Sequence, residues 1–135
     1  ESLPDQMIES LIALKNLNSG LLNLRQVFFG QYDQTLHRGV LQESTQDLWH
    51  RLRKEITLIS ESPGTNPVSN FGHLFGGYDS RYYGYLWSEV YAAALFEKFE
   101  NAGFDADGNC NDPQLGLKYR EQILAPGGSR DSSLS

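Results

Sequence analysis

Helical spacing of apolar residues is the feature of this sequence that most limits its fold. Between residues 2 and 39 apolar side chains return every three or four positions, and the same spacing recurs from 44 to 59 and after Pro113. Such a period places apolar side chains along one face of a helix. No segment alternates between apolar and polar residues for long enough to predict a sheet. The sequence therefore predicts an all-α fold.

Capping and breaking residues give the expected limits of the first three helices. The first begins at Ser2-Leu3-Pro4-Asp5, with a serine cap and a proline in the first turn. The second runs from Leu21 to His37-Arg38-Gly39, where glycine stops it. The third begins at Ser44, which forms a capping-box arrangement with Asp47. Its inward-facing residues are expected to be Leu48, Trp49, Leu52, Ile56 and Ile59.

The second half of the chain is also predicted to be helical. Residues 61–70 contain two prolines and no periodicity, and are expected to form a loop. A long helix is expected from Asp79 or Ser80 to Ala102, followed by a polar connection over residues 104–111. Asp112-Pro113 opens the last full helix, which the run from Ala125 to Ser129 ends. A further helix is expected to begin near Asp131.

Length, charge and cysteine content narrow the classes of function. The 135 residues suffice for one domain with a core, and their net charge is −6. No basic cluster is longer than Arg51-Leu52-Arg53-Lys54, so nucleic acid is not an expected partner. No apolar run approaches the length of a membrane span, so no membrane association is expected. A single cysteine, Cys110, fits a reducing compartment, and the cytoplasm is the expected location, with an organelle as the alternative.

No metal site is expected within this chain. The zinc-protease motif His-Glu-x-x-His is absent, as is any pair of histidines four residues apart. Asp105, Asp107 and Asn109 match the first three ligand positions of a calcium loop. However, Cys110 stands where the loop needs glycine, and Gly116 stands where it needs glutamate. The sequence therefore gives no reason to expect bound calcium.

The stretch from Phe71 to Tyr91 carries the strongest functional signal. It holds five of the seven tyrosines and four of the thirteen glycines. Phenol groups donate hydrogen bonds without carrying charge, and glycines allow a mobile loop. Tyr78, Tyr82 and Tyr85 share one face if the segment is helical. The opposite stripe is expected to pack inward and consists of Tyr83, Leu86, Trp87, Val90 and Ala94.

The spacing of these tyrosines is equally compatible with amphipathic packing, in which the hydroxyls simply face water. His73 and the Gly76-Gly77 pair beside them favour a binding surface. Such a surface could hold an extended, polar ligand.

Two segments of this stretch, Phe71–Tyr78 and Tyr82–Val90, closely resemble the thimet oligopeptidase family of zinc metallopeptidases. Segments 18–26, 63–66 and 119–129 also match that family in the right order, so the resemblance covers nearly the full chain. It implies that residues 1–135 are the C-terminal part of a metallopeptidase catalytic domain. The expected fold is then a multi-helix segment of a larger zincin-type helical peptidase domain with a Gly-rich substrate loop.

The resemblance also implies a cofactor and a reaction. Family members hold zinc with a His-Glu-x-x-His helix and a glutamate on a following helix, and neither lies in this chain. Zinc is therefore expected in the intact enzyme, with none bound by this chain, and the isolated chain is expected to be inactive. The resemblance implies that zinc in the intact enzyme would activate a water toward the carbonyl of a short peptide, whose oxygen then needs stabilisation as an oxyanion.

Individual roles follow from the same resemblance. Tyr85 is expected to stabilise the oxyanion, and His73 to hold the substrate or the intermediate, as the catalytic pair. The substrate-binding residues are expected to be Tyr78, Tyr82, Gly76 and Gly77, on a loop that closes over the peptide.

A different class of function stays open at this point, namely a freestanding helical module that binds peptides or acts as a scaffold without a metal. A segment of a larger domain should also expose apolar faces, so self-association is expected. The residues expected at those faces are Leu11, Ile12, Val27, Phe28, Phe29 and the Tyr82/Tyr85 face.

Overall fold

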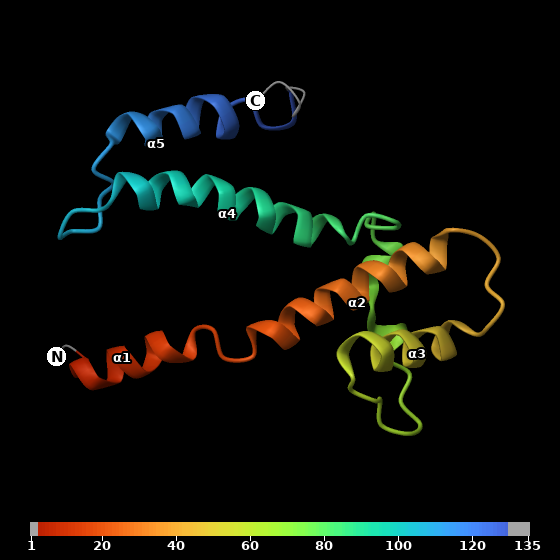
Figure 1. Ribbon diagram of the computed structural model, residues 1–135. Helices are drawn as coiled ribbons and strands as arrows, with labels where there is room; N and C mark the ends of the chain where they lie inside the picture. Colours follow the sequence, from red (N-terminus) through yellow and green to blue (C-terminus); the bar gives the residue numbers. More distant parts are fainter. Residues whose placement is uncertain (1–2, 130–135) are drawn as a thin grey trace. The chain divides into compact units, whose positions relative to one another are not determined.

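The computed structural model describes residues 3–129 and forms two compact units, Glu1–Trp87 and Ser88–Ser135 (Figure 1). The boundary between the units falls inside helix α4 (Gly84–Ala102). Among the described residues, the only strand-like pairing is an isolated bridge between Phe104 and Cys110. The all-α prediction is confirmed.

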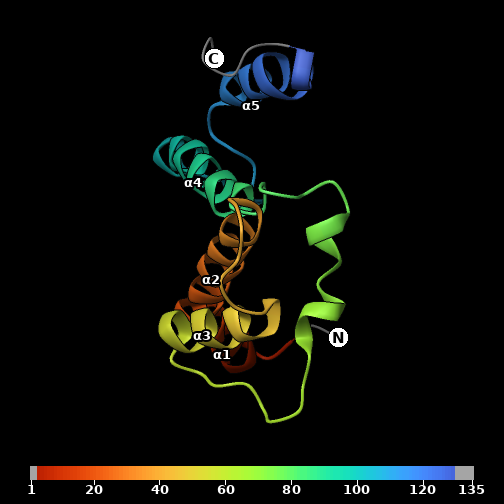
Figure 2. The same cartoon turned by 90° about the vertical axis from the view of Figure 1, so that its right-hand side faces the viewer.

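The first unit is built around one long helix. Its elements are α1 (Asp5–Leu14), α2 (Ser19–His37), α3 (Thr45–Thr57), the 3₁₀ turns η1 (Pro67–Asn70) and η2 (Gly72–Phe75), and the start of α4. Helix α3 packs against α2, and η1 packs against α3. Figure 2 shows the connection after α3 running round to the two 3₁₀ turns. The buried residues of α2 all lie in its C-terminal half, between Phe28 and Asp33.

The ends of these helices follow local signals in some places and tertiary contacts in others. Ser44 caps α3 by accepting a hydrogen bond from the Asp47 N–H at 3.0 Å, which confirms the predicted cap. Leu58 adopts φ 60° and ends the helix, so Ile59 lies beyond it and is 43% exposed. The prediction that Ile59 faces inward is therefore wrong. The predicted cap Ser2 lies outside the described residues.

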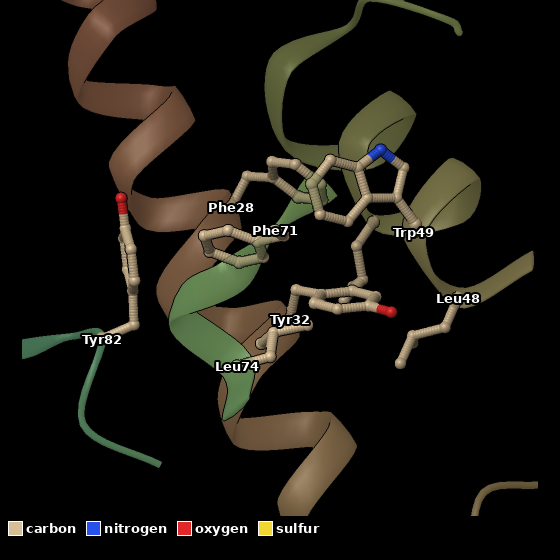
Figure 3. Close-up of a cluster of buried hydrophobic side chains, with 8 residues drawn as sticks. Phe28, Tyr32, Leu48, Trp49, Phe71, Leu74 and Tyr82 are labelled. Atoms are coloured by element: carbon tan, nitrogen blue, oxygen red, sulfur yellow. The ribbon is translucent and has the colours of Figure 1, made fainter. Parts of the chain in front are cut away.

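Aromatic side chains make up most of the core of this unit (Figure 3). The ring centroids of Phe28 and Trp49 are 4.8 Å apart and nearly perpendicular, and those of Phe29 and Phe71 are 4.7 Å apart. Such ring pairs add to the stabilisation from buried area. The buried hydrophobic set is Phe28, Tyr32, Leu48, Trp49, Leu52, Phe71, Leu74 and Tyr82. The core thus fixes the first half of the Phe71–Tyr91 stretch to α2 and α3.

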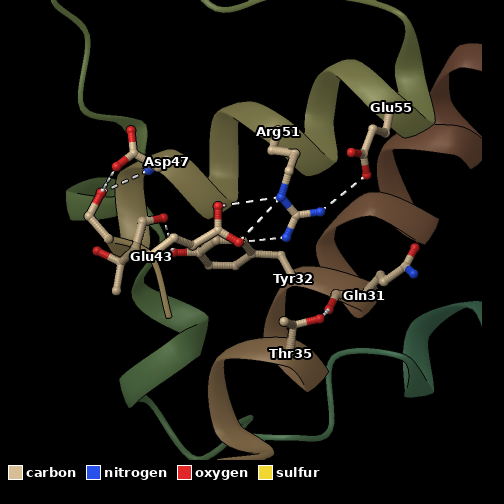
Figure 4. A network of polar contacts seen from close by, with 9 residues as sticks. Gln31, Tyr32, Thr35, Glu43, Asp47, Arg51 and Glu55 are labelled. Atoms are coloured by element: carbon tan, nitrogen blue, oxygen red, sulfur yellow. Dashed lines mark hydrogen bonds and ion pairs between the residues drawn. The ribbon is translucent and has the colours of Figure 1, made fainter. Parts of the chain in front are cut away.

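Polar contacts at the N-terminal end of α3 complete this packing (Figure 4). The Tyr32 hydroxyl donates to the backbone carbonyl of Thr45 at 3.0 Å. Burial raises the pKa of Tyr32 to about 12, although this hydrogen bond opposes the shift. Arg51 lies between Glu43 and Glu55 and donates to both carboxylates. This exposed network is weakly stabilising, whereas the buried Tyr32 bond joins α2 to the start of α3.

No residue of α1 is buried against the part of the chain that the structure describes. All of its large apolar residues are between 40% and 66% exposed; they are Met7, Ile8, Leu11, Ile12 and Leu14. Val27 on α2 is also exposed, as expected. Phe28 and Tyr82 were expected to be exposed as well, and that prediction is wrong because both lie in the aromatic core. Phe29 is half-buried against that core.

The predicted start of the long helix is also wrong. Helix α4 begins at Gly84 rather than at Asp79 or Ser80, because Ser80 adopts φ 61°, outside the helical region. The stripe expected to pack inward is not buried, and Tyr83 and Trp87 are 55% and 60% exposed. The side chain that enters the core instead is Tyr82.

The second unit contains the rest of α4, helix α5 (Pro113–Tyr119), a wider π-type turn η3 (Arg120–Leu124) and the short η4 (Gly127–Ser129). Asp112 caps α5 by accepting from the Gln114 N–H at 3.0 Å. Asp105 accepts from the Asn109 and Asp107 N–H groups, and the bonds from Asn109 hold the pKa of Asp105 below its usual value. Its carboxylate is thus used within its own turn. The helix predicted near Asp131 lies outside the described residues.

No helix among residues 3–129 combines the length and apolar character that crossing a membrane requires.

Candidate functional site

Four side chains singled out by the sequence lie together in the first unit. We call His73, Tyr78, Tyr82 and Tyr85 the His/Tyr cluster. The His73 ring lies 5.5, 5.4 and 5.9 Å from the rings of Tyr78, Tyr82 and Tyr85, measured between centroids. Tyr78 and Tyr85 are stacked at 5.6 Å with an interplanar angle of 17°, and Tyr82 and Tyr85 lie 4.9 Å apart. Every member therefore contacts at least two others.

The 3₁₀ turn η2, the connection that follows it and the first turn of α4 supply the four rings. His73 belongs to η2, Tyr82 precedes α4, and Tyr85 lies in the first turn of that helix. Tyr78 is not helical, so it does not share a helix face with Tyr85 as the sequence spacing suggested. It reaches Tyr85 because the chain turns back after η2.

The two glycines before Tyr78 make that turn possible. Gly77 adopts φ 88°, a conformation that L-residues rarely take. A Cβ added to Gly76 would lie 3.1 Å from the Gly72 carbonyl oxygen, closer than most such contacts. The backbone role of both glycines is thus explained, whereas their contact with a substrate stays a prediction.

The cluster has one buried phenol and two that are open to solvent. Tyr82 is 7% exposed, whereas Tyr78 and Tyr85 are 45% and 40% exposed. Burial raises the pKa of Tyr82, with Arg25 opposing the shift. Hydrogen bonding with the Tyr78 phenol raises the pKa of Tyr85. Tyr82 and Tyr85 therefore keep their protons at neutral pH and can act as uncharged hydrogen-bond donors.

A cavity of about 820 Å³ lies beside the cluster in the same unit. His73 and Tyr82 line it together with Phe71 and Trp49 of the core. Its polar lining comes from Asn18, Arg25, Gln26, Arg53, Thr57, Glu61 and Asn70. The volume lies within the range of small-ligand sites, which combine apolar walls with a few polar groups. His73 and Tyr82 thus connect the cluster to this hollow, whereas Tyr78 and Tyr85 are not among its lining residues.

A metal ion does not fit the side chains that the structure describes. Nowhere in residues 3–129 do three His, Cys, Asp or Glu side chains come together as a metal-binding group would require. The ring neighbours of His73 are Phe71 and the three cluster tyrosines. The tyrosines offer hydrogen bonds and ring contacts, and Phe71 offers a ring contact alone.

Sequence reasoning missed the residues of α2 that hold the turn before α4. The Asp33 carboxylate is fully buried and accepts hydrogen bonds from the N–H groups of Ser80 and Tyr82, both at 3.0 Å. Gln34 donates to the Ser80 carbonyl at 2.6 Å. One signal could have revealed Asp33: it is a carboxylate within the apolar stripe of α2, one turn after Phe29.

Gly30 is a second residue that sequence reasoning missed. It is buried in α2, and a Cβ added there would lie between 3.4 and 3.6 Å from three atoms of Tyr83. The small residue lets the chain just before α4 lie directly against α2. The sequence offered only the weak signal of a glycine in the middle of a predicted helix.

Comparison with known proteins agrees with the resemblance seen in the motifs. The sequence profile of Peptidase family M3 matches residues 1–134. The chain is 41% identical to a "Thimet-like oligopeptidase" of Dictyostelium discoideum, over 98% of this chain and 19% of that protein. It is 37% identical to "Saccharolysin" of Saccharomyces cerevisiae, over 97% of this chain and 18% of that protein.

A third relative comes from a plant. "Organellar oligopeptidase A, chloroplastic/mitochondrial" of Arabidopsis thaliana is 34% identical, over 96% of this chain and 17% of that protein. The chain thus spans less than a fifth of the length of each of these relatives. Because the family profile matches nearly every residue, the chain belongs to Peptidase family M3.

Proposed function

We propose that this chain is the C-terminal part of the catalytic domain of a zinc-dependent metalloendopeptidase that cleaves short peptides. The convergence of His73 with three tyrosines, beside a cavity that His73 and Tyr82 line, is the observation that carries this proposal. Membership of Peptidase family M3 and the oligopeptidase names of the relatives support it. In this proposal the cluster is the wall of the active site that faces the peptide.

The zinc ion would be held by residues outside this chain, since the described side chains include no group that fits it. The isolated chain would accordingly be inactive. What this chain contributes is hydrogen-bond donors in a fixed arrangement, which can stabilise charge without reorganising during the reaction.

Tyr85 is the proposed donor to the oxyanion that forms when the peptide carbonyl is attacked. Its phenol is partly exposed and, like that of any tyrosine, protonated at neutral pH, and hydrogen bonding with Tyr78 raises its pKa further. His73 would hold the substrate or the intermediate beside it. Tyr78, carried by the Gly76-Gly77 turn, would close over the peptide. Tyr82 would support the substrate-binding surface from beneath, where its ring packs against His73 and Tyr85.

The proposed location is the cytoplasm, because a single cysteine fits a reducing compartment. An organelle is the alternative, and the name of the Arabidopsis relative includes chloroplast and mitochondrion.

The decisive test is Tyr85→Phe in the full-length enzyme, assayed with a quenched fluorescent peptide. If Tyr85 stabilises the oxyanion, kcat should fall by about 100- to 1,000-fold while KM changes far less. Tyr83→Phe is the matched control, because Tyr83 is nearby, exposed and outside the cluster. It should leave kcat unchanged.

An unchanged kcat in Tyr85→Phe would reduce Tyr85 to a packing residue. A full-length protein without chelator-sensitive cleavage of any peptide would instead favour the freestanding binding module. The wild-type assay therefore comes first, and the substitution is compared with it.

A further inference from the structure

The buried carboxylate of Asp33 is the feature of this unit that packing alone does not explain. Its side chain is 0% exposed, and it lies on α2 among the aromatic residues of the core. Burying a carboxylate is unfavourable unless hydrogen bonds replace its hydration. His37 on the same helix lies beside it, with its Nδ1 2.9 Å from Oδ1 of Asp33 and hydrogen-bonded to the Asp33 backbone carbonyl, also at 2.9 Å.

The other partners of Asp33 lie nearly fifty residues further along the chain. Oδ1 accepts from the Ser80 N–H and Oδ2 from the Tyr82 N–H, each at 3.0 Å. Gln34 binds the opposite side of the same turn, because its Nε2 donates to the Ser80 carbonyl. Two adjacent residues of α2 thus hold three backbone groups of the chain just before α4.

The turn they hold is conformationally unfavourable by itself. Ser80 is a non-glycine residue at φ 61°, in the left-handed region where the Cβ crowds the backbone. Such a conformation persists when surrounding contacts determine it. It also ends any helical continuation from Ser80 into α4, so it sets the spacing between Tyr78 on one side and Tyr82 and Tyr85 on the other.

We propose that Asp33 is a positioning residue for the His/Tyr cluster. Its carboxylate fixes the left-handed turn at Ser80, and the turn directs Tyr82 and Tyr85 toward His73. This inference rests on the proposed function of the cluster in catalysis. Asp33 itself touches no reacting atom in this scheme, and its effect passes through the tyrosines.

The chemistry requires a carboxylate rather than any polar residue of that size. Each oxygen of Asp33 accepts one backbone N–H, so both must be acceptors. Asparagine has one acceptor oxygen, and its NH₂ group would face the other N–H without a bond. Asp33→Asn therefore keeps the volume and frees one of the two backbone groups.

The experiment uses the full-length enzyme with Asp33→Asn, Tyr85→Phe and the double variant. For Asp33→Asn we expect kcat to fall roughly 10- to 100-fold, since a small misplacement of catalytic groups has an effect of this size. In the double variant the two effects should be far from multiplicative, because both act on the same phenol. Hydrogen exchange at the Ser80 and Tyr82 amides should speed up in Asp33→Asn.

Tyr32→Phe is the control for a purely structural role. Tyr32 directly precedes Asp33 on α2, and its hydroxyl donates to the Thr45 carbonyl rather than to the turn at Ser80. The substitution therefore removes a hydrogen bond of α2 that does not hold the turn. It should destabilise the protein and leave kcat and the Ser80 and Tyr82 amides unchanged. Gln34→Met is the milder variant should Asp33→Asn fail to fold, and it should lower kcat by a smaller factor.

The proposal is overturned if Asp33→Asn folds with an unchanged kcat, or if its effect multiplies with that of Tyr85→Phe. It is also overturned if Tyr32→Phe lowers kcat as much. Failure of the proposed function looks different, because Tyr85→Phe alone would then leave kcat unchanged. Faster amide exchange at Ser80 and Tyr82 without loss of activity would limit Asp33 to the fold and reject its catalytic relevance.

Discussion

Three tyrosines of the first unit have a pKa above that of free tyrosine, and the causes differ among them. Burial raises the pKa of Tyr32 and of Tyr82, whereas a neighbouring phenol raises the pKa of the exposed Tyr85. At neutral pH all three are uncharged donors. Each of these pKa values differs from that of tyrosine in an unfolded chain, so each of the three groups makes the free energy of unfolding depend on pH.

Tyr32 should destabilise the fold at alkaline pH. Its pKa is about 12 when folded, against 10.0 for ordinary tyrosine, so the unfolded chain loses this proton first. The contribution of Tyr32 to stability is therefore complete below pH 10 and declines as pH rises through about 12. Urea unfolding between pH 9 and about 12 should show the free energy of unfolding falling more steeply for the wild type than for Tyr32→Phe. Equal slopes would contradict the claim that the raised pKa of Tyr32 lowers stability at alkaline pH.

At the scale of single residues, the sequence predicted which side chains meet but not how they are held. His73, Tyr78, Tyr82 and Tyr85 were identified from residue type, spacing and family resemblance, and they do lie together. Asp33 was missed because its partners are backbone N–H groups almost fifty residues away. Helical periodicity reports the face that a residue occupies and carries no information on such a partner.

At the scale of elements, the sequence was accurate where a helix end depends on its own residues. The Ser44 cap on α3 and the Asp112 cap on α5 were predicted and are present. The start of α4 was misplaced because contacts with α2 decide it. The left-handed Ser80 is held from α2, and Tyr82 rather than Tyr83 turns into the core.

Gly30 offers a test of how closely α2 and the start of α4 must approach. A Cβ at Gly30 would already be in van der Waals contact with Tyr83 at 3.4 Å, and the two γ-methyl groups of valine would extend beyond that contact. We expect Gly30→Val to lower the free energy of unfolding by about 1–3 kcal/mol, the usual effect of overpacking. Gly20→Val is the matched control on the same helix, because no atom lies within 4 Å of a Cβ at Gly20. Thermal unfolding should show a lower midpoint for Gly30→Val than for Gly20→Val. Equal midpoints would show that the close approach of α2 to Tyr83 does not require glycine at position 30.

At the scale of the whole molecule, the apolar surface exceeds what the core can cover. The core gathers around the C-terminal half of α2, while α1 and the first half of α2 keep large apolar residues exposed. The exposed set in these two segments includes Leu11, Ile12, Leu14, Leu21 and Leu22, and Leu17 on the connection between them is exposed as well. Contiguous apolar patches beyond roughly a few hundred Å² mark interaction surfaces in soluble proteins. This chain spans less than a fifth of the length of each compared relative. If the full-length protein has a comparable length, we expect its other segments to cover these faces.

The isolated chain should therefore self-associate through α1 and the start of α2. A second copy offers the same apolar face, which allows a symmetric contact. Light scattering across a dilution series should give a mass above 15.2 kDa that rises with concentration. Leu11→Gln combined with Ile12→Gln should lower that mass. Val40→Gln should not, because Val40 is 89% exposed and lies outside both segments. A chain that stays monomeric at high concentration and unfolds in one sharp transition would show that these faces need no partner.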